Sequence, residues 1–211
     1  MKFEIIFFDC DGVLVFDNLW ENLHNEIGMP HQLDRNWFDD YYAGKIKYQD
    51  WINNLENYYK KKQLNQTIFE RSLSKFSINP EALELINHVK KNNLKIAIIS
   101  SGIDYYVKKI ALELDIQDWR ANNSLQFNKN GKFRKLTYQT RDQVAKVVHV
   151  KEVCLKHSIS PKRAIFIGDS INDLEAFKYT KHGILYKPGD KPYKDIAWKT
   201  VDDLREIKKY I

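Results

Sequence analysis

Short, predominantly apolar runs separated by longer amphipathic segments are the main pattern in this chain. A run of this kind is typical of a strand that is buried on both faces, and four are predicted, at residues 3–9, 94–99, 164–167 and 183–186. Helices are predicted for segments between and after them, at residues 79–92, 104–114, 144–157 and 172–178. Strands that alternate with helices predict right-handed crossovers and an α/β fold, a doubly wound (Rossmann-like) parallel sheet flanked by helices.

Local signals add a hairpin and a last helix. Polar and apolar residues alternate over residues 124–135 around Asn130-Gly131, a dipeptide that favours the tight turn of a β-hairpin. Residues 202–211 are predicted to form a closing helix.

The chain is interrupted after its first strand by a long segment that has no strand signal. Residues 17–78 predict amphipathic helices, and the core is therefore expected in residues 1–16 and 79–211. Asn79, followed by Pro80, marks the start of the next core helix. The helical segment is expected to form a small cap over the carboxyl edge of the sheet.

Composition narrows the functional classes. The apolar runs are far shorter than the roughly 20 residues that cross a bilayer, and Cys10 and Cys154 form no CxxC pair, so a cytoplasmic protein is expected. The net charge is +6, and residues 129–163 contain ten Lys or Arg against two acidic residues. Such a stretch can steer an anionic substrate or contact nucleic acid. A solvated face is the favoured interpretation, and nucleic acid is not an expected partner.

Four aspartates follow two of the predicted strands. Asp9 and Asp11 follow the first strand, and Asp169 and Asp173 follow the strand at residues 164–167. Ligands of open α/β sheets bind beyond the carboxyl ends of the strands. An all-oxygen set suits Mg²⁺, and all four aspartates are candidate ligands. The pattern predicts a magnesium and phosphate site.

The same residues can carry phosphoryl transfer. Asp9 can attack phosphorus to form an aspartyl phosphate, and Asp11 can serve as general acid and base. Ser100 can donate to phosphoryl oxygens, and the backbone amides of Ser101 and Gly102 can complete the cradle.

The sequences DCDGV (residues 9–13) and GDSIND (residues 168–173), with Ser100 between them, resemble the motifs of the haloacid dehalogenase superfamily of phosphohydrolases. The resemblance spans nearly the whole chain and implies an enzyme of the phosphatase kind. It also implies a lysine that binds the phosphoryl group and the nucleophile. Lys146 is the preferred candidate and Lys151 the alternative.

Within the superfamily the chain looks most like the phosphoserine phosphatase-like branch, through residues 43–48, the hairpin and the chain ending. Two features depart from that branch. Gly12-Val13 stands where the branch has Ser-Thr, and its cap glutamate and arginine align with Asn18 and Asn53. An uncharged pair cannot neutralise the serine zwitterion. Asn18 and Asn53 are candidate substrate contacts, and phosphoserine is not the expected main substrate, although Asp17 or Glu21 can partly compensate.

Several alternatives stay open. Asn172 either orients a loop or the substrate, or caps its own helix, and Cys10 is interpreted as a buried filler. The aromatic residues of the cap are interpreted first as core, and lining a substrate pocket or contacting a second subunit are the alternatives; they are Trp20, Trp37, Phe38, Tyr41 and Tyr42. The favoured function is a magnesium-dependent phosphomonoester hydrolase that acts on a small phosphorylated metabolite. The alternatives are a nucleotide or nucleic-acid-end phosphatase, a phosphotransferase, and a silent binding protein on the same fold. The oligomeric state is not determined.

Overall fold

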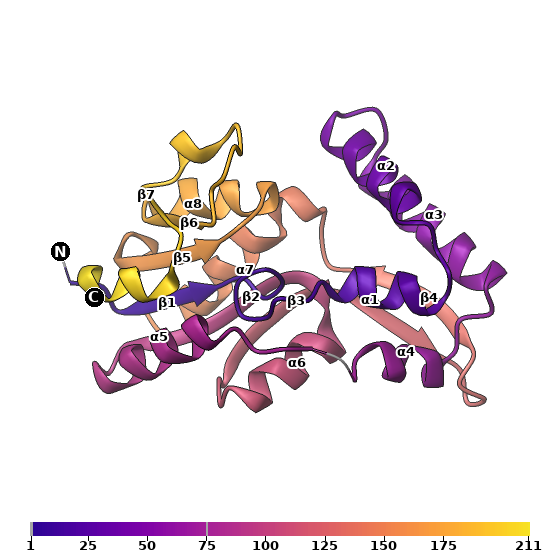
Figure 1. The fold of residues 1–211 in the computed structure, drawn as a ribbon, viewed down its shortest axis with the longest axis horizontal. Helices are drawn as coiled ribbons and strands as arrows, with labels where there is room; N and C mark the ends of the chain where they lie inside the picture. Colours follow the sequence, from indigo (N-terminus) through magenta and orange to yellow (C-terminus); the bar gives the residue numbers. More distant parts are fainter. Residues whose placement is uncertain (1, 75) are drawn as a thin grey trace.

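A seven-stranded sheet with helices on both faces forms the centre of the computed structural model, which describes residues 2–74 and 76–211 (Figure 1). The strands are β1 (Ile5–Phe8), β2 (Lys95–Ile103), β3 (Asp118–Phe127), β4 (Phe133–Tyr138), β5 (Ala164–Gly168), β6 (Gly183–Tyr186) and β7 (Lys199–Val201). Their spatial order is β4-β3-β2-β1-β5-β6-β7. All neighbours are parallel except β3 and β4, which form the expected hairpin. The predicted doubly wound α/β fold is confirmed.

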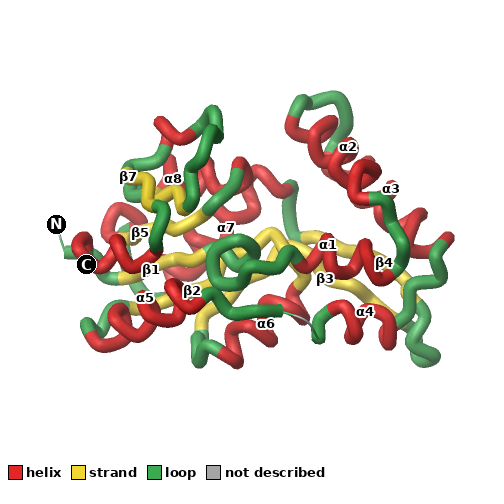
Figure 2. The backbone as a smooth tube through the Cα atoms, in the orientation of Figure 1, coloured by secondary structure: helices red, strands yellow, loops and turns green. Residues whose placement is uncertain are grey.

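Within the described residues, eight α-helices surround and extend this sheet (Figure 2). They are α1 (Leu19–Glu26), α2 (His31–Tyr42), α3 (Tyr48–Lys61), α4 (Gln66–Ser72), α5 (Pro80–Lys91), α6 (Asp104–Glu113), α7 (Asp142–Lys156) and α8 (Leu174–Thr180). Short 3₁₀ helices occupy Pro161–Arg163, Ile171–Asp173, Lys194–Ile196 and Leu204–Tyr210.

Strand β1 lies in the middle of the sheet and is buried on both faces. Ile5 and Phe7 pack in the cluster that contains residues of α7 and α8, and Ile6 and Phe8 pack in the cluster that contains residues of α5 and α6. Side chains of a strand alternate between the two faces, so a strand that is covered on both faces needs apolar residues at every position. The central position of β1 therefore explains why its sequence is an uninterrupted apolar run.

Helices α1 to α4 lie between β1 and α5 in the chain, within the range predicted for the cap. They stand beside the far end of the β3–β4 hairpin, away from the two termini (Figure 1). Two hydrogen bonds between described residues join α3 to β4. The Leu136 amide donates to Glu56 Oε1 at 3.0 Å, and the Tyr138 hydroxyl donates to Gln49 Oε1 at 2.7 Å. The hairpin thus supports the helical cap from the core.

Several elements differ from the predictions, among them β2, which continues beyond residue 99 to Ile103. Strand β3 begins at Asp118, because its first half pairs in parallel with β2 before its second half enters the hairpin. Strand β7 has only three residues, two of them exposed, and gives almost no apolar signal. The closing helix is a 3₁₀ helix, Leu204–Tyr210, in which the Asp203 side chain caps the Arg205 amide.

Along the described residues, no helix combines the length and the apolar character needed to cross a membrane. The basic stretch at residues 129–163 does not form one uniform face. Lys146 is buried inside the molecule, Lys156 pairs with Asp118, and Arg163 pairs with Glu4.

Candidate active site

The three central strands bring the predicted residues to one edge of the sheet. In the parallel register Phe8 lies beside Ile98 of β2 and beside Ile167 of β5. The residues that follow these positions therefore emerge at the same edge: Asp9 after β1, Ser100 within β2 and Asp169 after β5. The Asp9 amide also donates to the Ile167 carbonyl at 2.9 Å, which fixes the start of this loop. The carboxyl edge is where ligands of such sheets bind.

Lys146 of α7 reaches this edge from one face of the sheet. Its side chain is only 1% exposed, and its Nζ lies 2.9 Å from Asp9 Oδ2 and 2.5 Å from Asp173 Oδ1. Nζ also donates to Asn172 Oδ1 at 2.9 Å. Lys151, the alternative, is exposed on the same helix. The geometry therefore favours Lys146.

Asp173 holds the loop together rather than standing free. Its Oδ2 accepts hydrogen bonds from the amides of Asp169 and Ser170, at 3.0 and 2.9 Å, while Oδ1 faces Lys146. A Cβ atom on Gly168 would lie 2.2 Å from the Asp173 carboxyl carbon, so this packing requires glycine. Both oxygens of Asp173 have protein partners, as do both oxygens of Asp9, and the role of Asp173 as a metal ligand stays a prediction.

Asn172 is placed by the same lysine. Its Oδ1 accepts hydrogen bonds from Lys146 Nζ and from the Ser170 hydroxyl, the latter at 2.7 Å. Among the described residues, the Asn172 side chain makes no hydrogen bond to an amide of the helix that follows it. The arrangement matches the loop-orienting interpretation, not the capping one.

A cation can be held by carboxylates at this edge. Oxygens of Asp9, Asp169 and Asp173 lie within 4.8 Å of one another, with one buried lysine among them. Mg²⁺ is usually held by one or two carboxylates, with water and phosphate completing its shell. Asp9 and Asp169 fit that description. The Asp11 carboxylate is outside this group of oxygens, and its predicted role as a metal ligand stays a prediction.

The ionisation of these groups follows from burial. Burial raises the pKa of Asp11 to about 7, and the nearby Asp169 charge adds to the shift. Burial, with the charge of Asp173, raises the pKa of Asp169 to about 6. The pKa of Asp9 is also raised by burial, against the opposing effect of Lys146. Excess negative charge in a buried site favours a bound cation.

Cys10, between the two aspartates, plays the expected structural part. It is fully buried, and burial raises the pKa of its thiol. A protonated, inaccessible thiol is not a nucleophile.

Gly12 allows the first loop to touch the Asp169 side chain. Its φ is +76°, and a Cβ atom there would lie 2.5 Å from Asp169 Oδ2. Any larger residue would both strain the backbone and push on a candidate metal ligand.

The predicted phosphate cradle is only partly as expected. The Gly102 amide donates to Ser100 Oγ at 2.9 Å, so it orients this serine and is not free for a ligand. Ser100 keeps its hydroxyl proton to donate. Ser101 Oγ is buried without a partner in the described part of the chain, and Ser101 lines the pocket. Ser101 can therefore contribute its side chain as well as its amide.

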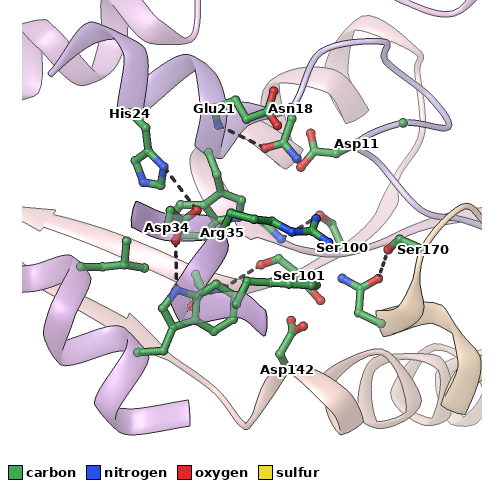
Figure 3. Close-up of a pocket in the computed structure, with 18 of the residues that line it drawn as sticks. Asp11, Asn18, Glu21, His24, Asp34, Arg35, Ser100, Ser101, Asp142 and Ser170 are labelled. Carbon is green, nitrogen blue, oxygen red and sulfur yellow. Dashed lines mark hydrogen bonds and ion pairs between the residues drawn. The ribbon is translucent and has the colours of Figure 1, made fainter. Parts of the chain in front are cut away.

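A cavity of about 480 Å³ opens above this edge and extends under the cap. Figure 3 shows Glu21 and His24 of α1, and Asn18 at the N-cap position of that helix. They face Ser100 and Ser101 across the cavity. Asn18 lines it, although its Oδ1 is engaged as the N-cap acceptor of the Glu21 amide.

Asn53 is not in the cavity wall, which corrects the prediction of substrate contact. Its side chain is exposed on the outer face of α3 and accepts a hydrogen bond from Gln49 Nε2 at 2.9 Å. An aligned position on a helix does not guarantee the same face toward the pocket, because that depends on how the helix packs.

Arg35 of α2 was not identified from the sequence. It is the one lysine or arginine among the described residues that line the cavity, and it lies between Asp34 and Ser100 in Figure 3. The signal in the sequence was its position three residues before Phe38 on one helix, which places the two side chains on the same side of that helix.

A cap-to-core contact was also missed. The Tyr42 hydroxyl donates to Asp142 Oδ2 at 2.6 Å, and this joins the end of α2 to the first turn of α7. Because α7 also carries Lys146, the cap is tied to the helix that places this lysine.

Comparisons with known proteins agree with this geometry. The sequence profile of the haloacid dehalogenase-like hydrolases matches residues 3–179. A phosphoserine phosphatase from Methanocaldococcus jannaschii is 26% identical, over all of this chain and 98% of its own length. One from Archaeoglobus fulgidus is 25% identical over 92% of this chain, which spans only 55% of that protein's length. A solved structure described as a phospho-aspartyl intermediate analogue of phosphoserine phosphatase has a TM-score of 0.84 at 24% identity, with both chains fully covered, and supports the fold.

Proposed function

The chain belongs to the haloacid dehalogenase-like hydrolase family, in its phosphoserine phosphatase-like branch, and on that premise we propose that it is a magnesium-dependent phosphomonoester hydrolase with Asp9 as nucleophile. The observation that carries the proposal is the contact of buried Lys146 with Asp9 and Asp173 at the edge where Ser100 and Asp169 also emerge. Phosphoryl transfer depends mainly on positioning and charge stabilisation, which such a constellation supplies.

The first step joins Asp9 to the phosphoryl group. A carboxylate oxygen of Asp9 attacks phosphorus, the bond from phosphorus to the leaving oxygen breaks, and Asp11 gives its proton to that oxygen. With a pKa of about 7, Asp11 is available in its protonated form near neutral pH. Lys146, 2.9 Å from Asp9, keeps the nucleophile charged and oriented.

The second step releases phosphate. Water loses a proton to Asp11 and attacks phosphorus, and the bond between Asp9 and phosphorus breaks. The Ser100 hydroxyl, oriented by the Gly102 amide, donates to phosphoryl oxygens in both steps. Mg²⁺ held by Asp9 and Asp169 would neutralise charge on those oxygens.

The expected substrate is a small phosphorylated metabolite other than phosphoserine. The curated relatives are named phosphoserine phosphatases, so phosphoserine is the reference compound for any test. Among the described residues of this chain, neither Asn18 nor Asn53 offers a charge for the serine head group, and Asn53 faces away from the cavity.

The decisive experiment measures phosphate release from a panel of phosphate monoesters with and without Mg²⁺. Wild-type protein should require the metal, and Asp9→Asn should abolish turnover. Asp202→Asn, which changes an exposed carboxylate far along the chain, should retain it. Metal-independent turnover, or turnover that survives in Asp9→Asn, would contradict the proposal.

The role of Asp11 has a separate test. With p-nitrophenyl phosphate, whose leaving group needs no proton, Asp11→Asn should release about one equivalent of nitrophenolate and then stall. Mass spectrometry should locate one phosphoryl group on the peptide that contains Asp9. Steady wild-type turnover by Asp11→Asn would exclude Asp11 as the acid and base.

A further inference from the structure

The carboxylates on the cap side of the cavity already have partners. Asp34 accepts a hydrogen bond from Trp51 Nε1 at 3.0 Å and lies 3.4 Å from His24 Nδ1. Glu21 lies 3.4 Å from His31 Nε2. A substrate ammonium group would have to compete with these contacts for the oxygens of Asp34 and Glu21.

Arg35 is also engaged within the cap. Its Nε lies 3.1 Å from Asp39 Oδ1, and its guanidinium carbon lies 5.1 Å from the centroid of the Phe38 ring. The charge is thus compensated by Asp39, and the planar group is held against an aromatic face. The Arg35 guanidinium, stacked on the Phe38 ring, therefore extends the flat aromatic surface that lines the cavity.

Most of the remaining cap residues that line the cavity are aromatic or aliphatic, beside the polar Asn18, His24, Asn25 and His31. The aromatic side chains that line it are Trp20, Phe38, Tyr48 and Trp51, and the aliphatic ones are Met29, Ile52 and Leu55. The volume of about 480 Å³ lies within the range of pockets that hold drug-sized ligands. A three-carbon amino acid would leave most of this apolar wall against water, which is unfavourable.

We propose that the leaving group of the substrate is an alcohol that bears an uncharged planar ring, and that this ring packs between the aromatic side chains of the cap. This inference rests on the proposed function. The phosphate end stays at Asp9 and Ser100, while Trp20 of α1 and Trp51 of α3 contact the ring. Flat rings gain both apolar burial and offset stacking in such a setting, together worth roughly a tenfold preference or more.

The test compares esters that have similar leaving-group basicity and differ in the ring: methyl phosphate, benzyl phosphate and O-phosphoserine. For wild-type protein, kcat/KM for benzyl phosphate should exceed that for each of the others by at least about tenfold. In Trp20→Leu the ratio of kcat/KM for benzyl to methyl phosphate should fall at least about fivefold. Trp37→Leu provides the matched control, since Trp37 is half-buried on α2 and does not line the cavity, and it should keep the wild-type ratio.

The outcomes separate this proposal from the proposed function. Phosphoserine hydrolysed as well as benzyl phosphate, or an unchanged ratio in Trp20→Leu, would overturn the ring-bearing leaving group while leaving a phosphatase intact. If no ester is hydrolysed, the phosphatase proposal fails. Calorimetry with benzylphosphonate and methylphosphonate in the presence of Mg²⁺ then still decides the ring question. Tighter binding of the benzyl compound, weakened in Trp20→Leu, supports the proposal, and equal binding contradicts it.

Discussion

At the scale of single residues, the contact between Gly12 and Asp169 links backbone conformation to the candidate metal site. Gly12→Ala adds a Cβ atom 2.5 Å from Asp169 Oδ2 at a φ of +76°. The left-handed backbone alone costs roughly 1–2 kcal/mol for alanine. Displacement of the carboxylate should lower kcat/KM by a further factor of about 100.

Gly44 is a matched control for this prediction. Its φ is +74°, and a Cβ atom there meets nothing within 4 Å. Gly44→Ala should lower the free energy of unfolding by a similar backbone amount without loss of kcat/KM. Urea unfolding and steady-state kinetics on both variants give the answer, and equal activity in the two would disprove the link.

Substitutions of Lys146 and of Lys151 test which of the two lysines acts on the nucleophile Asp9. Lys146→Met removes the cation between Asp9 and Asp173 and leaves buried carboxylates without compensation. The free energy of unfolding should fall by roughly 3 kcal/mol, and kcat/KM should fall at least about 100-fold. Lys151→Met, on the exposed side of α7, should change neither by a measurable amount. A large activity loss in Lys151→Met would reverse the assignment.

At the scale of elements, α7 carries a buried histidine that makes the core sensitive to acid. His149 is 0% exposed, its Nε2 faces Gln139 Oε1 at 3.1 Å, and its Nδ1 is buried without a partner in the described residues. Burial lowers its pKa from 6.5 to about 4, with Glu152 opposing and Arg120 adding to the shift.

The consequence is a defined pH window. Between pH 6.5 and about 4 the unfolded chain binds a proton at this histidine that the folded chain does not. The free energy of unfolding should therefore fall by up to about 3 kcal/mol as the pH is lowered through that window. Denaturant unfolding should show a flatter pH dependence in His149→Gln than in wild type. His31→Gln, at an exposed site, should retain the wild-type slope. Equal slopes in all three proteins would exclude His149 as the cause.

At the scale of the whole molecule, the carboxylate cluster should couple metal binding to stability. A cation that binds only the folded chain stabilises it by about 2.7 kcal/mol at one hundred times its Kd. For a chain of this size that corresponds to a rise in Tm of roughly 5–10 °C. Calorimetry with Mg²⁺ and with a chelator should show the rise in wild type and in Asp202→Asn, and its loss in Asp169→Asn. A rise that persists in Asp169→Asn would place the cation elsewhere.

The local pattern of the sequence determined the layout of the core and the chemistry of its edge. Buried parallel strands need apolar residues on both faces, so β1 and β5 are visible as runs, and the residue after a run must lie at the sheet edge. Asp9 and Asp169 could therefore be placed from the sequence alone. The Asn130-Gly131 pair likewise revealed the hairpin. The loop itself also depends on Asn128, whose side chain accepts hydrogen bonds from the Asn130 and Lys132 amides.

Only the tertiary structure decided which cap residues face the cavity and which partners each aspartate has. Arg35 points inward and Asn53 outward because helix packing, not residue type, sets the face that each helix presents. Asp173 accepts two local hydrogen bonds from backbone amides, and its contact with Lys146 joins it to a distant part of the chain. Strand ends are specified by nearest neighbours along the chain, whereas the wall of a pocket is assembled from several segments at once and has no local signature.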